Sequence, residues 1–172
     1  NTGSAVTIEA LELGAFDFIL KPVDLKTNLS DFKLELWMKI LSANKKESSG
    51  LLKKNNLIKT ESKNDIRNIK AVVIGASTGG PKALVYLIQR LPEKIKTPIF
   101  IVQHMPEGFT ASFAQRLHDL SKVDVSEAEH NERIRPGKVY LAPGGKHMTI
   151  IQNKLVLNDN EKLHGVKPAI DY

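Results

Sequence analysis

The stretch Ala71–Pro81, AVVIGASTGGP, predicts a buried strand that turns sharply into a helix. The residues from Ala71 to Gly75 are apolar and largely β-branched, and glycine ends the run, which is typical of a short, fully buried strand. Residues 75–79 then satisfy the pattern G-x-S-x-G, in which a serine on a strained turn is exposed where its hydroxyl can attack a substrate. Ser77 is therefore a candidate nucleophile.

The same turn has a second interpretation. A glycine-rich turn between a strand and a helix can also hold a phosphate group, because backbone N–H groups at the start of the helix face the anion. The pattern alone does not decide between a nucleophile and a phosphate- or nucleotide-binding turn, so both interpretations stay open at this point.

From residue 70 onward, apolar strands alternate with helices whose apolar positions form one stripe. The expected helices cover 81–90 and 109–120, and the expected strands cover 71–75, 98–103, 123–128, 138–142, 147–151 and 154–157. Strand–helix–strand–helix order with continuous apolar strands predicts an α/β fold. We expect a parallel, doubly wound, Rossmann-like sheet with a late β-hairpin excursion.

His104 directly follows the second expected strand, as Ser77 follows the first. Ligands of such sheets bind outside the carboxyl ends of the strands, and successive strands are often neighbours, so we expect both side chains to face one crevice. An imidazole there can take the serine proton and later return it to the leaving group. The alternative is a strand-end histidine bonded only to backbone.

The other four histidines give weaker indications of function. His118 is expected on a solvated helix face, His130 in a polar turn and His164 in a loop. His147 is expected to start a strand rather than to line a site. No His-x-x-x-His or His/Glu cluster occurs, so we expect neither a metal site nor another cofactor.

The composition excludes several classes of protein. The chain has no cysteine, which excludes disulfides, a thiolate nucleophile and cysteine-ligated zinc. No apolar run approaches the ~20 residues that span a bilayer, and no signal-peptide pattern opens the chain, so we expect a cytoplasmic location without membrane insertion. The net charge of +6 is concentrated between residues 45 and 70, where aromatic residues are absent. We therefore expect a flexible basic linker over 45–69 rather than a nucleic-acid surface.

The first segment, residues 1–44, predicts a helix over 7–13, a strand over 16–20 and a helix capped by Asp31. Residues 9–22, EALELGAFDFILKP, resemble the end of a response-regulator receiver domain. The resemblance implies that Lys21 contacts a phosphorylated aspartate, that the bond before Pro22 is cis, and that the aspartate and its magnesium ligands lie upstream of this chain. Without them, Lys21 is equally well interpreted as a surface lysine.

Residues 70–172 resemble the first part of the catalytic domain of chemotaxis protein-glutamate methylesterases. The matching segments are GASTGG (75–80), QHMPEGFT (103–110), FAQRL (113–117), RPG (135–137) and YLAPGGKHM (140–148). One departure is His130-Asn131, where the family commonly has an Asp–Gly turn.

This resemblance implies a serine hydrolase of γ-glutamyl methyl esters in chemoreceptor helices, which can also deamidate receptor glutamines. Ser77 would be the nucleophile and His104 the base, with Thr78 and Met105 as neighbours of the site. The implied partners are chemoreceptor helices and, through a full receiver domain, a sensor histidine kinase. No nucleic acid is implied.

The resemblance also implies a third catalytic residue, an aspartate from a glycine-rich segment beyond Tyr172. Asp171 does not stand in that motif, so we expect the triad aspartate to lie outside this chain and the chain alone to have little activity. Two other functions stay open, a non-catalytic two-component adaptor and the phosphate- or nucleotide-binding turn.

Overall fold

The computed structural model describes residues 2–22, 29–44 and 69–172, and the expected linker lies almost wholly outside them. Of these residues, 2–16 and 70–172 belong to one compact unit, and 17–22, 29–44 and 69 belong to a second. Within the described residues, no helix is long and apolar enough to cross a membrane.

The larger unit is built on a parallel sheet. Its strands are β1 (Val72–Ala76), β2 (Ile99–Gln103), β3 (Val125–Glu127) and β4 (Val139–Leu141). They lie in the order β1-β2-β4-β3, and every pair runs parallel. The connection from β1 to β2 holds α3 (Gly80–Ile88), and that from β2 to β3 holds α4 (Thr110–Asp119). The predicted α/β, Rossmann-like fold is confirmed.

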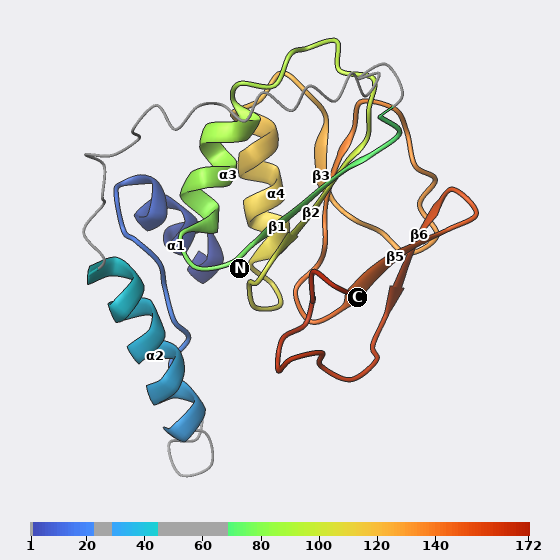
Figure 1. The fold of residues 1–172 in the computed structure, drawn as a ribbon. Coiled ribbons are helices and arrows are strands. Elements are labelled where there is room, and N and C mark those ends of the chain that lie inside the picture. Colours follow the sequence, from blue (N-terminus) through green and yellow to red (C-terminus); the bar gives the residue numbers. More distant parts are fainter. Residues whose placement is uncertain (1, 23–28, 45–68) are drawn as a thin grey trace, which may run out of the picture. The chain divides into compact units, whose positions relative to one another are not determined.

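The sheet is covered differently on its two faces. In Figure 1, α3 and α4 lie side by side along one face, with Ile88 and Phe113 fully buried. The late hairpin of β5 (His147–Ile151) and β6 (Lys154–Asn158) is antiparallel. Its Leu155 packs with Phe100 of β2 and Tyr140 of β4, whose rings stack 5.5 Å apart. Apolar burial on both sides therefore stabilises the middle of the sheet.

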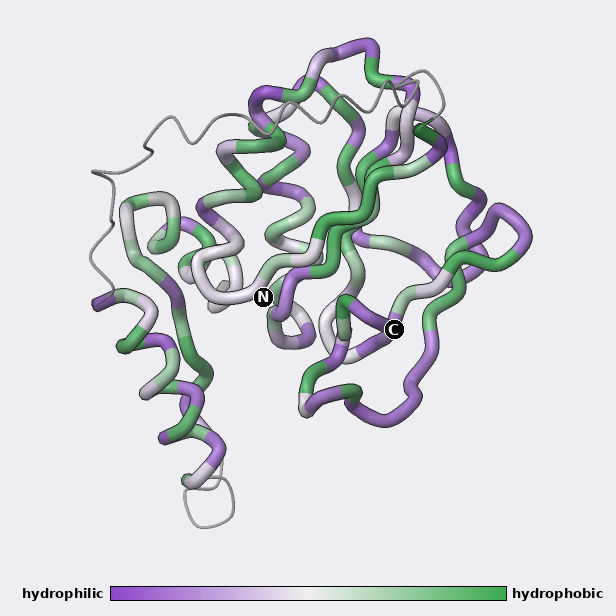
Figure 2. Tube along the Cα trace, in the orientation of Figure 1, coloured by the Kyte–Doolittle hydropathy of each residue, from purple (hydrophilic) through white to green (hydrophobic). Residues whose placement is uncertain are grey.

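The two strands that precede the candidate site differ in burial. All five residues of β2 are buried, because β2 lies between β1 and β4. By contrast, β1 pairs only with β2 among the described strands, and Val73 is 64% exposed. The prediction of a fully buried first strand was therefore wrong, although Figure 2 shows both strands as hydrophobic stretches.

The helix predicted over 7–13 begins earlier, as α1 (Thr2–Glu12). Its Ile8 and Leu11 are buried, and the helix packs against α3 and α4 within the larger unit. The hydroxyls of Ser4 and Ser112 are 2.8 Å apart and join α1 to α4. The amino-terminal helix is thus part of the compact unit that holds the sheet.

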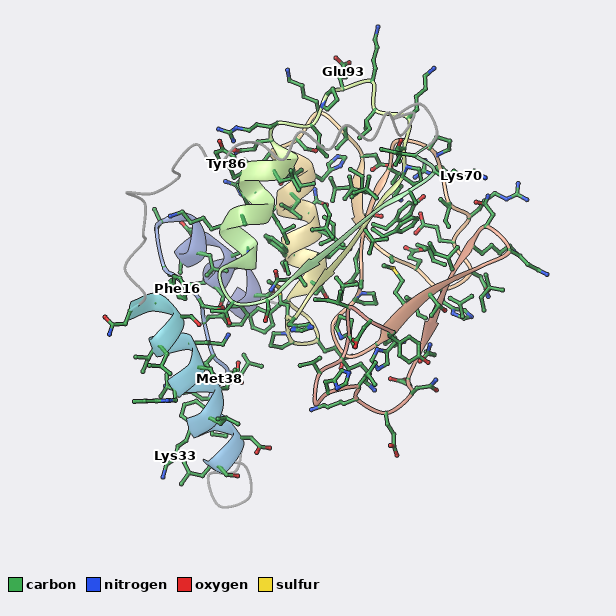
Figure 3. The ribbon with its side chains drawn as sticks, in the orientation of Figure 1. Phe16, Lys33, Met38, Lys70, Tyr86 and Glu93 are labelled. Carbon is green, nitrogen blue, oxygen red and sulfur yellow. The ribbon has the colours of Figure 1, made fainter. Side chains whose placement is uncertain are left out.

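In the second unit, the predicted helix is α2 (Leu29–Asn44). Its apolar stripe is largely exposed, and Figure 3 shows Met38 projecting from it. The strand predicted over 16–20 is wrong, because these residues are coil and pair with no described strand. Lys39 instead bonds Asp17 and the carbonyl of Phe18.

The prediction of a cis peptide bond before Pro22 is also wrong. Among the described residues, the cis bond is Lys167–Pro168.

Candidate active site

Ser77 and His104 lie side by side because the register of the sheet makes them cross-strand neighbours. The last ladder pair of β1 and β2 is Ala76 with Gln103, and the N–H of His104 donates to the carbonyl of Ala76 at 3.0 Å. Nδ1 of His104 is 3.2 Å from Oγ of Ser77. The structure therefore brings together the two residues that the sequence singled out, at the carboxyl edge of the sheet.

The turn after β1 leaves the Ser77 hydroxyl accessible. Ser77 and Thr78 are exposed, while Gly79 has φ = 74° and Gly80 donates its N–H to the carbonyl of Ser77 at 2.7 Å. A positive φ of this size favours glycine. The turn thus ends at the amino end of α3, where the helix dipole and backbone N–H groups favour negative charge.

The histidine is less exposed to solvent than the serine. Its ring is partly buried, which lowers the pKa of His104, and the carboxylate of Asp171 opposes this shift. A lowered pKa keeps the imidazole neutral near pH 7, and only the neutral ring can accept a proton.

The second ring nitrogen of His104 has no described partner. Nε2 is buried without a hydrogen bond among the described residues, and Asp171 is itself paired with Nε2 of His164 at 3.0 Å. A buried ring nitrogen of this kind calls for a polar partner. The position where a carboxylate would orient the ring is therefore defined, and no described carboxylate is bonded there.

Gln103 belongs to the site, although the sequence pattern did not single it out. It is the last residue of β2, and only 2% of its surface is exposed. Its Nε2 donates to the carbonyl of Ser77 at 3.0 Å and to that of His104 at 3.1 Å. The available signal was a polar residue closing an otherwise apolar strand, PIFIVQ.

The loops after β2 and β4 are held together by close backbone packing. The N–H of Gly144 donates to Oγ1 of Thr110 at 2.9 Å, and that hydroxyl donates to Oε1 of Glu127 at 2.5 Å. A Cβ on Gly144 would lie 2.5 Å from the carbonyl of Pro106, two residues after His104. Met105 between them is buried. This packing fixes the backbone that carries the histidine.

The other histidines have structural contacts. His147 is fully buried; its Nε2 donates to the carbonyl of Glu161 at 3.0 Å, its Nδ1 accepts from Ala169, and its ring stacks on Tyr172. It starts β5, as predicted.

His118 and His130 accept backbone N–H bonds from Val125 and Leu157. Across the described ranges, no three His, Asp or Glu side chains are grouped to hold a metal ion.

The parallel α/β sheet with a serine–histidine pair at its carboxyl edge defines a class of candidate serine hydrolases. Comparison with known proteins gives a narrower result. The family described as CheB methylesterase matches residues 72–172.

Named relatives agree with that match. A protein-glutamate methylesterase/protein-glutamine glutaminase of Archaeoglobus fulgidus is 43% identical over 98% of this chain and 51% of its own length. One of Clostridium acetobutylicum with the same name is 44% identical over 98% of this chain and 50% of its own length.

A solved structure is also similar. The crystal structure of the Thermotoga maritima CheB methylesterase catalytic domain has a TM-score of 0.55 and 46% identity, covering 59% of this chain and 56% of that one. The chain belongs to the CheB methylesterase family. It spans about half the length of the curated relatives that it matches.

Proposed function

We propose that this chain carries the nucleophile and the base of a serine hydrolase that removes methyl groups from glutamate methyl esters of chemoreceptors. The observation that carries this proposal is the 3.2 Å approach of His104 Nδ1 to Ser77 Oγ at the exposed carboxyl edge of the sheet. Membership of the CheB methylesterase family supplies the substrate class.

In the first half of the proposed reaction, Ser77 Oγ attacks the carbonyl carbon of the methyl ester while its proton moves to Nδ1 of His104. The negative charge passes to the carbonyl oxygen, and backbone N–H groups at the amino end of α3 stabilise it. The intermediate then collapses: the bond to the methoxy group breaks, and that group leaves as methanol with the proton from His104.

In the second half, water attacks the acyl-serine. His104 takes a proton from the water, the tetrahedral intermediate breaks its bond to Ser77 Oγ, and the serine recovers a proton from His104. The glutamate carboxylate is released. With a receptor glutamine as substrate, the same steps release ammonia, so we include deamidation in the proposal.

We also propose that an aspartate outside this chain bonds the buried Nε2 of His104, as the family resemblance implies. An orienting carboxylate matters greatly: replacing it by its amide in a serine protease lowers kcat by about 10⁴-fold. For that reason we expect little activity from the 172 residues alone.

A regulatory role for the amino-terminal segment is also part of this proposal. From the resemblance of residues 9–22, we propose that residues 1–44 are the end of a receiver domain, whose complete form would accept a phosphoryl group from a sensor histidine kinase. Chemoreceptor helices are the proposed substrate and partner, and the proposed location is the cytoplasm.

Two measurements test the function. Each is made on this chain and on the protein translated from the whole open reading frame that encodes it, which we call the open-reading-frame product. The first is methanol release from methylated chemoreceptor signalling helices, and the second is labelling by a fluorophosphonate probe. We expect Ser77→Ala to abolish both, while Ser42→Ala on α2 leaves both unchanged.

Failure of the open-reading-frame product to label or to release methanol would contradict the proposal. A melting temperature raised by nucleotide in that unreactive protein would instead support the phosphate- or nucleotide-binding turn.

A further inference from the structure

We infer that Gln103 is a positioning residue that sets the spacing between the nucleophile and its base. The inference rests on the proposed hydrolase function. Its side-chain amide bridges the backbone carbonyls of Ser77 and His104, the two residues whose side chains meet at 3.2 Å.

The bridge begins where the sheet ends. The last ladder bond between the two strands runs from His104 N–H to the carbonyl of Ala76. Beyond it, the chain after β1 turns into α3 and that after β2 enters a loop, so no backbone bond of the ladder reaches the carbonyl of Ser77 from β2. The amide of Gln103 makes that connection from the side chain.

The geometry selects glutamine among the residue types. One nitrogen donates to both carbonyls, which requires two N–H groups on a single neutral atom at this reach. Glutamate would place an acceptor against two acceptors, methionine has no donor, and asparagine is one methylene shorter. Because Gln103 is 2% exposed, water does not readily replace the lost bonds, and two carbonyls would be left without this donor.

The oxygen of the Gln103 amide explains why residue 80 is a glycine. Oε1 of Gln103 is buried without a hydrogen bond among the described residues, and a Cβ on Gly80 would lie only 2.0 Å from it. Gly80 does not have a positive φ, so its missing side chain is explained by space rather than by backbone conformation. The GG of the glycine-rich turn thus serves two needs: Gly79 allows the turn and Gly80 leaves room for the amide.

Loss of the bridge would change the distance between the Ser77 hydroxyl and the His104 ring. A displacement of about 1 Å between reacting groups costs about 10²-fold in rate, even when it arises from a residue that touches no substrate. We therefore expect Gln103→Met to lower kcat by about 10- to 100-fold in the open-reading-frame product, with KM changed less than about 2-fold. The matched control is Gln115→Met on α4, because the exposed Gln115 amide bonds Asp119 on the same helix and its loss should leave kcat unchanged.

A second variant and an NMR measurement test the inference even if Gln103→Met does not fold. Gly80→Ala retains the amide but drives it from its place, so kcat should fall by a comparable factor; its Cβ would also meet that of Ala76 at 2.9 Å. In this chain itself, the side-chain NH₂ protons of Gln103 should exchange slowly with water in ¹H–¹⁵N spectra, whereas those of Gln115 should exchange quickly.

The outcomes separate this inference from the proposed function. If the wild-type protein neither releases methanol nor labels, the function fails, while protected Gln103 protons still support the bridge. If Gln103→Met folds and keeps the wild-type kcat, the positioning role is wrong and the function stands. Rapid exchange of the Gln103 protons in the wild-type chain overturns the bridge itself.

Discussion

Two neighbouring strands, β1 and β2, end in the same place but present opposite environments. Beyond β1, whose Val73 is 64% exposed, the Ser77 hydroxyl is open to solvent; beyond the fully buried β2, His104 is partly buried with a lowered pKa. A nucleophile must be reached by its substrate, whereas a base must be fixed and neutral. Among the described strands, β1 lies at the edge of the sheet and β2 in its middle, and this difference supplies both conditions for the proposed roles.

The largest expected effect tests whether His104, at the end of the buried strand β2, is the base. In the open-reading-frame product, His104→Gln should lower kcat by about 10⁴-fold, because the Ser77 proton then has no acceptor. Methanol release measures it. His118→Gln, at the far end of α4, serves as the control and should retain full activity; equal retention by His104→Gln would rule out the assigned base.

The next effect tests the burial contrast directly through the free energy of unfolding. Ile101 in β2 is fully buried, so Ile101→Ala should cost about 2–5 kcal/mol. Val73→Ala in β1 should cost less than about 1 kcal/mol, because the side chain is already largely in water. Urea unfolding of both variants gives the comparison. Similar losses would show that β1 is covered in solution.

A smaller effect on the free energy of unfolding concerns the packing between the loops that follow β2 and β4. Gly144→Ala places a Cβ 2.5 Å from the carbonyl of Pro106, and such overpacking typically costs about 1–3 kcal/mol. Gly3→Ala in α1 meets no atom within 4 Å and is the matched control. Thermal unfolding should show a lower Tm for Gly144→Ala alone. An unchanged Tm would mean that the loop after His104 moves to make room for the added Cβ without loss of stability.

The smallest effect is a shift in pH dependence. Asp171 raises the pKa of His104 against the lowering by burial, so Asp171→Asn should lower that pKa further. Activity, which needs the neutral ring, should then persist to lower pH. The acid limb of the kcat/KM profile measures this, with Asp119→Asn as the control. A limb that moves to higher pH would contradict the electrostatic assignment.

Hydrophobic periodicity predicted most of the larger unit. The parallel sheet, its two crossover helices and the late hairpin occur within a few residues of their expected bounds, because continuous apolar runs and amphipathic stripes report burial. Burial of β1 was predicted wrongly because β1 lies at the edge of the sheet that the described strands form, and composition does not report strand order. The strand at 16–20 failed because a strand also needs a neighbour to bond.

The site was predictable where residue chemistry is distinctive. Ser77 and His104 were found from a turn motif and from their places after strands, and their roles stay predictions. Gln103 was missed because a single polar residue at the end of an apolar strand has no distinctive pattern. Its meaning depends on which carbonyls lie within reach, and only the three-dimensional register supplies that information.

The pairing of Ala76 with Gln103 has a consequence for how this chain can change in length. The serine–histidine distance is set by the spacing of hydrogen-bonded strands, which is about 4.8 Å in all sheets. Exchanging one core side chain for another alters the free energy of unfolding but does not change this spacing between the strands. Inserting a single residue into β1 would instead turn every side chain beyond the insertion to the opposite face of the sheet and shift Ser77 out of register with His104. Insertions should therefore be tolerated in the hairpin turn at Gln152 and Asn153, and not in either strand.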